Sequence, residues 1–186
     1  MRRFRLLVTS AVVSIFAALG VVAPAEAAVD FFLEVNGVTG ESTDAKQAKS
    51  IEIESFSWGA AASAKKNAVS LHDLSITKFV DRSSPALFER LVQGTTIPSV
   101  ELIARRAGEV QLIFLRYCLE DVQVTSQQQA GHGADTVTEN VTFRYGSFSQ
   151  QYTPQDSKGG GLPPVFAGWN ATTGTLIETY PNPCGL

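Results

Sequence analysis

The sequence has little with which to build a metal site, a disulfide-rich scaffold or a nucleic-acid surface. It contains two cysteines and two histidines among 186 residues, whereas a metal site usually needs more ligands at defined spacing. Its 15 Lys and Arg are outnumbered by 18 Asp and Glu, giving a formal charge of −3, so no basic excess is available to hold a polyphosphate or an anionic membrane surface. We therefore expect no metal, no cofactor and no nucleic-acid partner.

Catalytic motifs are also lacking. No Gly-x-Ser-x-Gly pattern surrounds any serine, and His72 and His132 have no convincing catalytic or metal environment. Glu52 and Glu54 lie two apart on a predicted strand and so share a face, a geometry that a glycosidase uses for one of its carboxylates. Acids that alternate with isoleucines are, however, typical of a solvated strand face. We expect no catalytic residues.

The N-terminal region differs in composition from everything that follows. Three arginines among the first five residues precede the uncharged apolar run Leu6–Val22, and an Ala-x-Ala pattern ends at Ala27. This order predicts a secretory signal peptide, residues 1–27, cleaved between Ala27 and Ala28. An uncleaved anchor is the alternative, because the run is close to the shortest spanning length of roughly 17 residues. The sequence predicts a secreted or cell-envelope protein, without membrane contact after cleavage, whose single domain is 28–186.

That domain consists mainly of predicted β-strands. Alternating or β-branched and aromatic runs predict strands at 30–35, 51–58, 69–80, 99–105, 110–125, 136–143, 147–153, 165–169 and 175–180. No repeated crossover helices separate them, which excludes a parallel α/β fold. The sequence predicts an antiparallel β-barrel of two packed sheets, closed or nearly closed, with one short flanking α-helix.

The one helix has clear start and stop signals. Ser84 can cap its first turn, Pro85 suits the first helical position and Gly94 can end it in a left-handed conformation. Its predicted apolar side consists of Leu87, Phe88 and Leu91. The sequence therefore predicts a short amphipathic helix beside the strands.

Two loops and the C-terminal segment complete the predicted domain. The stretch 40–49 has no apolar period and predicts a long exposed loop, and 60–66 predicts a hairpin tip. From about residue 154 the chain becomes rich in Gly and Pro. Cys118, in a predicted strand, and Cys184, near the C-terminus, can form a disulfide that fixes this segment if the protein is exported; two free cysteines are the alternative.

Several stretches of the chain together resemble one known family. The longest is VSLHDLSITKFVDRSSPAL at Val69–Leu87. The others, in family order, are 32–42, 55–59, 119–122, 139–143, 152–155 and 168–170. Their joint order and spacing resemble the haemolysin-coregulated protein (Hcp) family, the tube proteins of bacterial type VI secretion, over nearly all of the domain.

The resemblance implies a function in assembly without catalysis. It implies a two-sheet barrel that forms a homohexameric ring, with rings stacking into a hollow tube that carries secreted effector proteins. Ring closure needs a head-to-tail interface and stacking needs projecting elements, so the two loops supply the candidate subunit or ring contacts, with solvated loops as the alternative. These contact residues are Glu41, Ser42, Thr43, Asp44, Lys46, Lys65 and Lys66.

The N-terminal segment departs from the family pattern, because tube proteins of this family leave through the secretion apparatus and need no cleavable signal. Two other functions therefore stay open. One is an extracellular binding module or effector that uses the same barrel, with Trp169 and Tyr180 as candidate contact residues; the other is a secreted hydrolase, which lacks a supporting motif.

Overall fold

The structure is a computed structural model that describes residues 28–62, 69–108, 111–131, 133, 136–181 and 184. The predicted signal peptide, with Ala27 at its end, lies outside the described residues, as do Lys65 and Lys66. Ala28 is the first described residue, and its carbonyl accepts a hydrogen bond from the Ala107 N–H at 2.8 Å. In the described part of the chain, no helix is long and apolar enough to cross a membrane.

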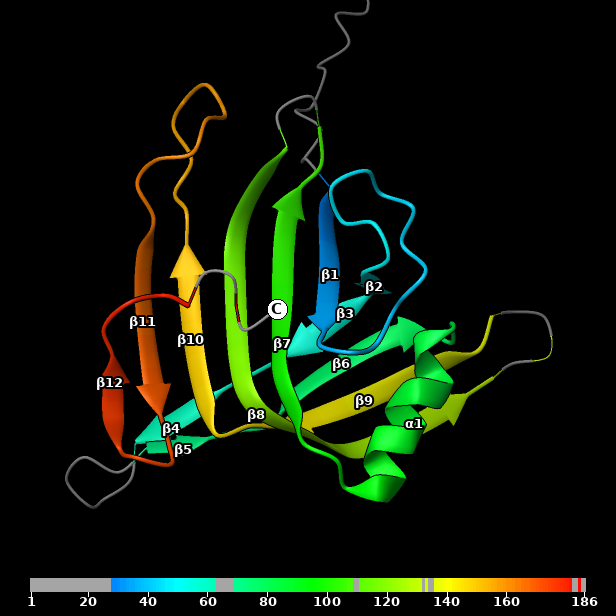
Figure 1. Cartoon of the computed structure of the whole chain (residues 1–186). Coiled ribbons are helices and arrows are strands. Elements are labelled where there is room, and N and C mark those ends of the chain that lie inside the picture. The colour runs from blue at the N-terminus through cyan, green and yellow to red at the C-terminus, as the bar shows by residue number, and fades with distance from the viewer. Residues whose placement is uncertain are drawn as a thin grey trace, which may run out of the picture.

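The strands form a large sheet, sheet A, and a smaller sheet, sheet B, and all their pairings are antiparallel (Figure 1). Sheet A has the order β12-β11-β10-β8-β7-β1-β2, with bounds β1 (Val29–Val35), β2 (Ile51–Ile53), β7 (Ile97–Arg106), β8 (Leu112–Ala130), β10 (Ser147–Tyr152), β11 (Val165–Asn170) and β12 (Thr175–Ile177). Sheet B contains β3 (Ser55–Ser57), β6 (Leu74–Phe79), β9 (Thr138–Arg144) and the second half of β8. A separate hairpin consists of β4 (Ala60–Ala62) and β5 (Val69–Leu71).

The long strand β8 belongs to both sheets and turns the chain from one to the other. Its first half pairs with β7 and β10, and from Gln123 onward it pairs with β9. Asp121, at the change of partner, has a positive φ of 54°, a conformation that Asp tolerates better than most residues. The sheets therefore cross and enclose one core between them.

Two packed antiparallel sheets with one flanking helix are confirmed, but the predicted closed barrel is wrong. On the side away from β8, β2 runs into β3, and the Glu54 N–H donates to the Thr77 carbonyl at 2.8 Å. Beyond β8, strands β10, β11 and β12 extend sheet A to a free edge (Figure 1). The sheets stay open because sheet B has too few strands to cover the whole width of sheet A.

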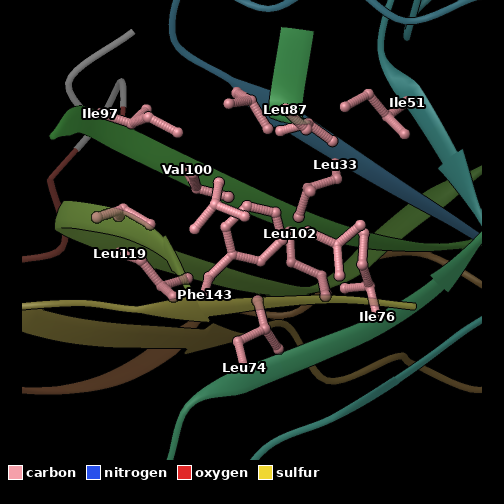
Figure 2. Packing of buried hydrophobic residues seen from close by; sticks show 14 of the residues in the cluster. Leu33, Ile51, Leu74, Ile76, Leu87, Ile97, Val100, Leu102, Leu119 and Phe143 are labelled. Carbon is pink, nitrogen blue, oxygen red and sulfur yellow. The ribbon is translucent and has the colours of Figure 1, made fainter. Parts of the chain in front are cut away.

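The core lies between the sheets and under the helix, where alternate residues of each strand point inward (Figure 2). Leu33, Leu102 and Leu119, from neighbouring strands of sheet A, are fully buried, and so are Leu74 and Phe143 from sheet B. Burying an apolar side chain of this size contributes roughly 1.5–3 kcal/mol. This cluster is the main source of stability in the framework that positions the surfaces described below.

Helix α1 (Ser83–Gln93) forms at the predicted place and ends as predicted, with Gly94 left-handed at φ 62°. Two details of the prediction are wrong. Ser84 makes no cap; Asp81 instead accepts a hydrogen bond from the Ser83 N–H at 2.9 Å. Phe88 is 56% exposed, because only Leu87 points straight into the core, leaving an apolar ring on the surface.

Candidate assembly surface

Apolar side chains gather on and beside the outer face of α1. Phe88 and Val92, one turn apart, are both more than half exposed. Beside them, the Val80 N–H donates to the Val137 carbonyl at 2.9 Å, and both of these valines are exposed, as is Phe79. Val80 and Phe88 line one open depression of about 450 Å³. We call Phe79, Val80, Phe88, Val92 and Val137 the helix patch.

A buried ion pair fixes α1 to sheet B beneath the helix patch. Lys78 Nζ lies 2.8 Å from Glu139 Oε1, and both side chains are fully buried. Ser84, in the first turn of α1, donates to the same oxygen at 2.6 Å. Burial acts to raise the pKa of Glu139, but hydrogen bonds from Lys78, Ser84 and two glutamines outweigh it and lower that pKa. The carboxylate therefore stays ionised and holds the helix in place.

A second group of exposed apolar side chains lies at the free edge of sheet A. Tyr152 of β10 and Val165 of β11 are cross-strand neighbours, and both are exposed. Phe166 and Leu176, on β11 and β12, are 43% and 73% exposed, and Leu162 precedes them. We call Tyr152, Leu162, Val165 and Leu176 the edge patch; Phe166, next to Val165 along β11, points to the opposite face of sheet A. The outer side of β12 has no neighbouring strand among the described residues, so its backbone groups are open to pairing.

The two patches lie on opposite sides of the molecule, with α1 at one end and β11 and β12 at the other (Figure 1). Contiguous exposed apolar surface is typical of interaction sites. Two different patches on opposite sides of one subunit suit a head-to-tail contact, which closes into a ring when the rotation allows it.

The predicted contact loop is folded onto sheet A instead of projecting freely. The Gly40 N–H donates to the Lys49 carbonyl at 2.7 Å, and the Ser42 N–H to the Ser50 carbonyl at 3.1 Å. A Cβ at Gly40 would lie 2.3 Å from the Ser50 carbonyl oxygen, so only glycine allows this approach. The stretch is a long loop and most of its residues are exposed, as expected, but its own backbone hydrogen bonds give it a fixed course.

Within that loop, Asp44 is an anchor and not a free contact residue. Both of its carboxylate oxygens accept from the Arg105 guanidinium, at 2.8 and 2.7 Å, and Arg105 also binds Asp30 at 2.9 Å. The hydrogen bonds from Arg105 hold the pKa of Asp44 well below its usual range. Ser42 is buried as well. Of the predicted set, Glu41, Thr43 and Lys46 are exposed, and Lys65 and Lys66 lie outside the described residues.

The two cysteines are joined on the outer face of sheet A, the face turned away from the core. Cys118 and Cys184 form a disulfide with their Cα atoms 5.5 Å apart, and both are buried. Near it, Tyr180 donates to Glu101 Oε1 at 2.9 Å, and Arg116 binds the same carboxylate oxygen at 2.9 Å. Burial and the neighbouring Glu101 raise the pKa of Tyr180 well above its usual range.

The candidate aromatic residues of a binding module are Trp169 and Tyr180, and Trp58 is the other tryptophan of the chain. Trp169 lies between Phe148 and Leu176 in the register of sheet A and is half-buried. Trp58 stacks on Phe148 with ring centroids 4.0 Å apart. Since Tyr180 is held by Glu101, the candidate aromatics do not form a shared platform for a peptide or glycan.

In the part of the chain that the structure describes, the acidic residues and histidines considered for catalysis or metal binding do not form a common site. Glu52 and Glu54 are both exposed at the surface, as the solvated-face interpretation predicts. His72 has an exposed side chain and accepts a hydrogen bond at its backbone carbonyl, and His132 lies outside the described residues. Within the described ranges, no three His, Cys, Asp or Glu side chains are grouped to hold a metal ion.

Sequence reasoning missed the buried charges Lys78 and Arg105. A signal for the first was present: Leu74, Ile76 and Lys78 alternate along one strand, so period two places Lys78 on the inward face with the two apolar residues. No comparable signal marks Arg105, because its carboxylate partner lies in a loop whose course is set by tertiary packing.

Comparison with known proteins relates most of this chain to one family. Residues 32–152 match the family model described as type VI secretion system effector, Hcp. "Protein hcp1" of Pseudomonas aeruginosa is 36% identical over 156 residues, covering 77% of this chain and 95% of the relative.

Solved structures give the same relationship. Hcp1 from Salmonella typhimurium is 30% identical with a TM-score of 0.69, covering 81% of this chain and 99% of the other. A type VI secretion system effector from Yersinia pestis is 26% identical with a TM-score of 0.66, covering 76% of this chain and 99% of the other.

Proposed function

This chain belongs to the Hcp family of type VI secretion system effectors, and we propose from that premise that its subunits assemble head to tail into rings. The family assignment makes it a tube and effector-carrier protein of type VI secretion. A homohexamer, and effector proteins as its cargo, are what the family resemblance implies for this chain.

The observation that carries ring assembly is the presence of two unlike apolar patches on opposite sides of one subunit. In a head-to-tail contact, the helix patch of one subunit packs on the edge patch of the next. Phe88 and Leu176 are large apolar side chains on the two sides, and each is more than half exposed in the isolated subunit. Burying both removes apolar surface from water at every interface of the ring.

The proposal has two further parts: the protein is exported by its N-terminal segment, and it has no catalytic function. The N-terminal segment has a basic region, an apolar region and an Ala-x-Ala pattern, in the order of a signal peptide. This order supports cleavage between Ala27 and Ala28 and a mature domain 28–186. Non-enzymatic function is supported by the lack of a catalytic motif and by the tube role of the family. Glu41, Thr43 and Lys46, with Lys65 and Lys66 of the hairpin, remain the proposed contacts between stacked rings.

Sedimentation of the purified mature domain tests the ring. We expect the wild-type protein to sediment as a hexamer, and Phe88→Glu and Leu176→Glu to shift it toward the subunit mass. Val29→Glu is the matched control, because Val29 is 41% exposed outside both patches and lies opposite Arg106 in the sheet. A wild-type domain that stays monomeric at high concentration would favour the extracellular binding module instead.

A further inference from the structure

The open depression beside the helix patch has an apolar wall and a polar wall. Its volume is about 450 Å³, and its apolar wall consists of Val80, Pro85 and Phe88. The polar wall consists of Gln127 and Gln129 of β8, and we call these two residues the glutamine wall. A purely aliphatic occupant would leave the glutamine wall without hydrogen bonds. The depression therefore suits a side chain with an apolar body and a polar tip.

The other two residues that line the depression are engaged by groups beneath it. Asp81 Oδ1 lies 2.6 Å from Lys78 Nζ and also accepts a hydrogen bond from the Ser83 N–H at 2.9 Å. The Ser84 hydroxyl donates to Glu139 Oε1 at 2.6 Å. The glutamine wall is therefore the part of the lining that has hydrogen-bonding capacity left for a partner.

The glutamine wall presents acceptors more than donors. The Gln127 amide nitrogen donates to the Ser84 carbonyl at 3.1 Å and to Glu139 Oε2 at 2.8 Å. The Gln129 amide nitrogen donates to the same carboxylate oxygen at 3.0 Å. The buried Oε1 of Gln127 has no hydrogen-bond partner among the described residues, and Gln129 is exposed. Because both nitrogens are bonded to the buried Glu139, a partner that covers this wall must bring a donor.

The edge patch contains one side chain of the required kind. Tyr152 carries a hydroxyl on an aromatic ring and is 43% exposed, whereas the rest of the edge patch consists of two leucines and a valine. A tyrosine ring can pack on a phenylalanine ring while its hydroxyl makes a hydrogen bond at the polar end. The hydroxyl can donate to an amide oxygen, which an aliphatic side chain cannot do.

We propose that Tyr152 of one subunit inserts into the depression of the next, where its ring packs on Phe88 and its hydroxyl donates to Gln129 Oε1. This contact rests on the proposed head-to-tail ring and identifies the residues that make it selective. Gln129 is the acceptor because it is exposed and its bond to Glu139 holds the amide in place. An interface that closes over the depression shields the bond from water, so the loss of either partner weakens assembly.

A double-mutant cycle tests the pair. Tyr152→Phe removes only the hydroxyl, and Gln129→Met removes the amide at an exposed position. We expect each substitution to raise the concentration at which half of the subunits are assembled by about fivefold, and the double substitution to raise it no further. Sedimentation over a dilution series measures this concentration. Tyr117→Phe is the matched control, because Tyr117 packs in an aromatic cluster outside both patches, and it should leave assembly unchanged.

A photo-reactive side chain locates the contact in space. With p-benzoylphenylalanine in place of Tyr152, irradiation should join neighbouring subunits, and mass spectrometry of the digest should find the cross-link within 80–88 or 127–129. In an intact ring, cross-links elsewhere, an unchanged midpoint for Tyr152→Phe or additive effects in the cycle would overturn this contact and leave ring assembly standing. A wild-type protein that stays monomeric would overturn both.

Discussion

The two ends of sheet A are held by different means. At the helix end, sheets A and B and α1 surround the core, and a fully buried Lys78–Glu139 pair ties the helix to the strands. At the other end, β11 and β12 extend beyond sheet B with largely exposed side chains, and a disulfide joins the chain end to β8. The disulfide therefore lies at the end of sheet A where few side chains are buried. There it supplies stability that the hydrophobic core supplies at the helix end.

The two apolar patches therefore differ in what supports them. The helix patch lies on and beside α1, which is bonded to a buried ion pair of sheet B, whereas the edge patch lies on and beside strands at the free edge of sheet A. A head-to-tail contact would therefore join a surface packed over the core to one at the edge of a single sheet. The predictions below alter one end at a time, in order of decreasing effect on stability.

Breaking the buried ion pair should have the largest effect. Glu139→Ala removes the fully buried partner of Lys78 and leaves the ammonium only its pair with Asp81 at 2.6 Å, so we expect a loss of about 3–4 kcal/mol in the free energy of unfolding, at the lower end for a broken buried pair. Urea unfolding followed by tryptophan fluorescence measures it. Glu52→Ala, at an exposed position, should change the value by less than about 0.5 kcal/mol; equal effects of the two substitutions would mean that the pair does not anchor the helix.

Removing the disulfide should have the next largest effect. Cys184→Ser frees a loop with a sequence separation of 66, and we expect a loss of about 2–4 kcal/mol. The same urea experiment, run on oxidised wild type and on the variant, gives the difference. Oxidised and reduced wild type with identical midpoints would contradict a stabilising bond.

Much of the framework could be predicted from the sequence, because its signals are local. Alternation gave the strand positions, and Gly94 gave the end of the helix. Closure into a barrel could not be predicted, since it depends on how many strands cover each sheet and not on any one segment. The fixed course of the 40–49 loop was missed because Arg105, 61 residues from Asp44 in sequence, determines it.

The candidate surface was predicted less well than the fold. Phe88 was assigned to the buried side because it is apolar and beside Leu87, but adjacent residues on a helix point about 100° apart. The edge patch could not be predicted from the sequence, because the exposed and the buried residues of β11 are both apolar. The Cys118–Cys184 bond could be named from the sequence only as one of two alternatives, because the segment between β12 and Cys184 has no regular pattern.

The loop anchor should give a smaller effect that depends on pH. The pKa of Asp44 is lowered in the folded protein by Arg105, so its contribution to stability is fully present above the unfolded value of about 3.9 and is lost as the pH falls below it. We expect the urea midpoint of wild type to fall between about pH 4 and pH 2 more steeply than that of Asp44→Asn. If the urea midpoints of the two proteins change in parallel with pH, Asp44 does not stabilise the loop through Arg105.

Substitutions in the patches should change stability least and assembly most. Phe88 and Leu176 are exposed in the subunit, so Phe88→Glu and Leu176→Glu should each shift the free energy of unfolding by less than about 0.5 kcal/mol. Urea unfolding of the dissociated subunits measures this. A large loss in either variant would mean that the residue supports the fold and would leave no separate assembly role for it.

Mixing the two patch variants tests head-to-tail assembly most directly. A Phe88→Glu subunit keeps an intact edge patch and a Leu176→Glu subunit keeps an intact helix patch, so one sound interface forms between them and none beyond it. Sedimentation of the equimolar mixture should show heterodimers and nothing larger, while each variant alone stays a monomer. A mixture that remains monomeric, or variants that each form the wild-type oligomer alone, would contradict a contact between the helix patch and the edge patch.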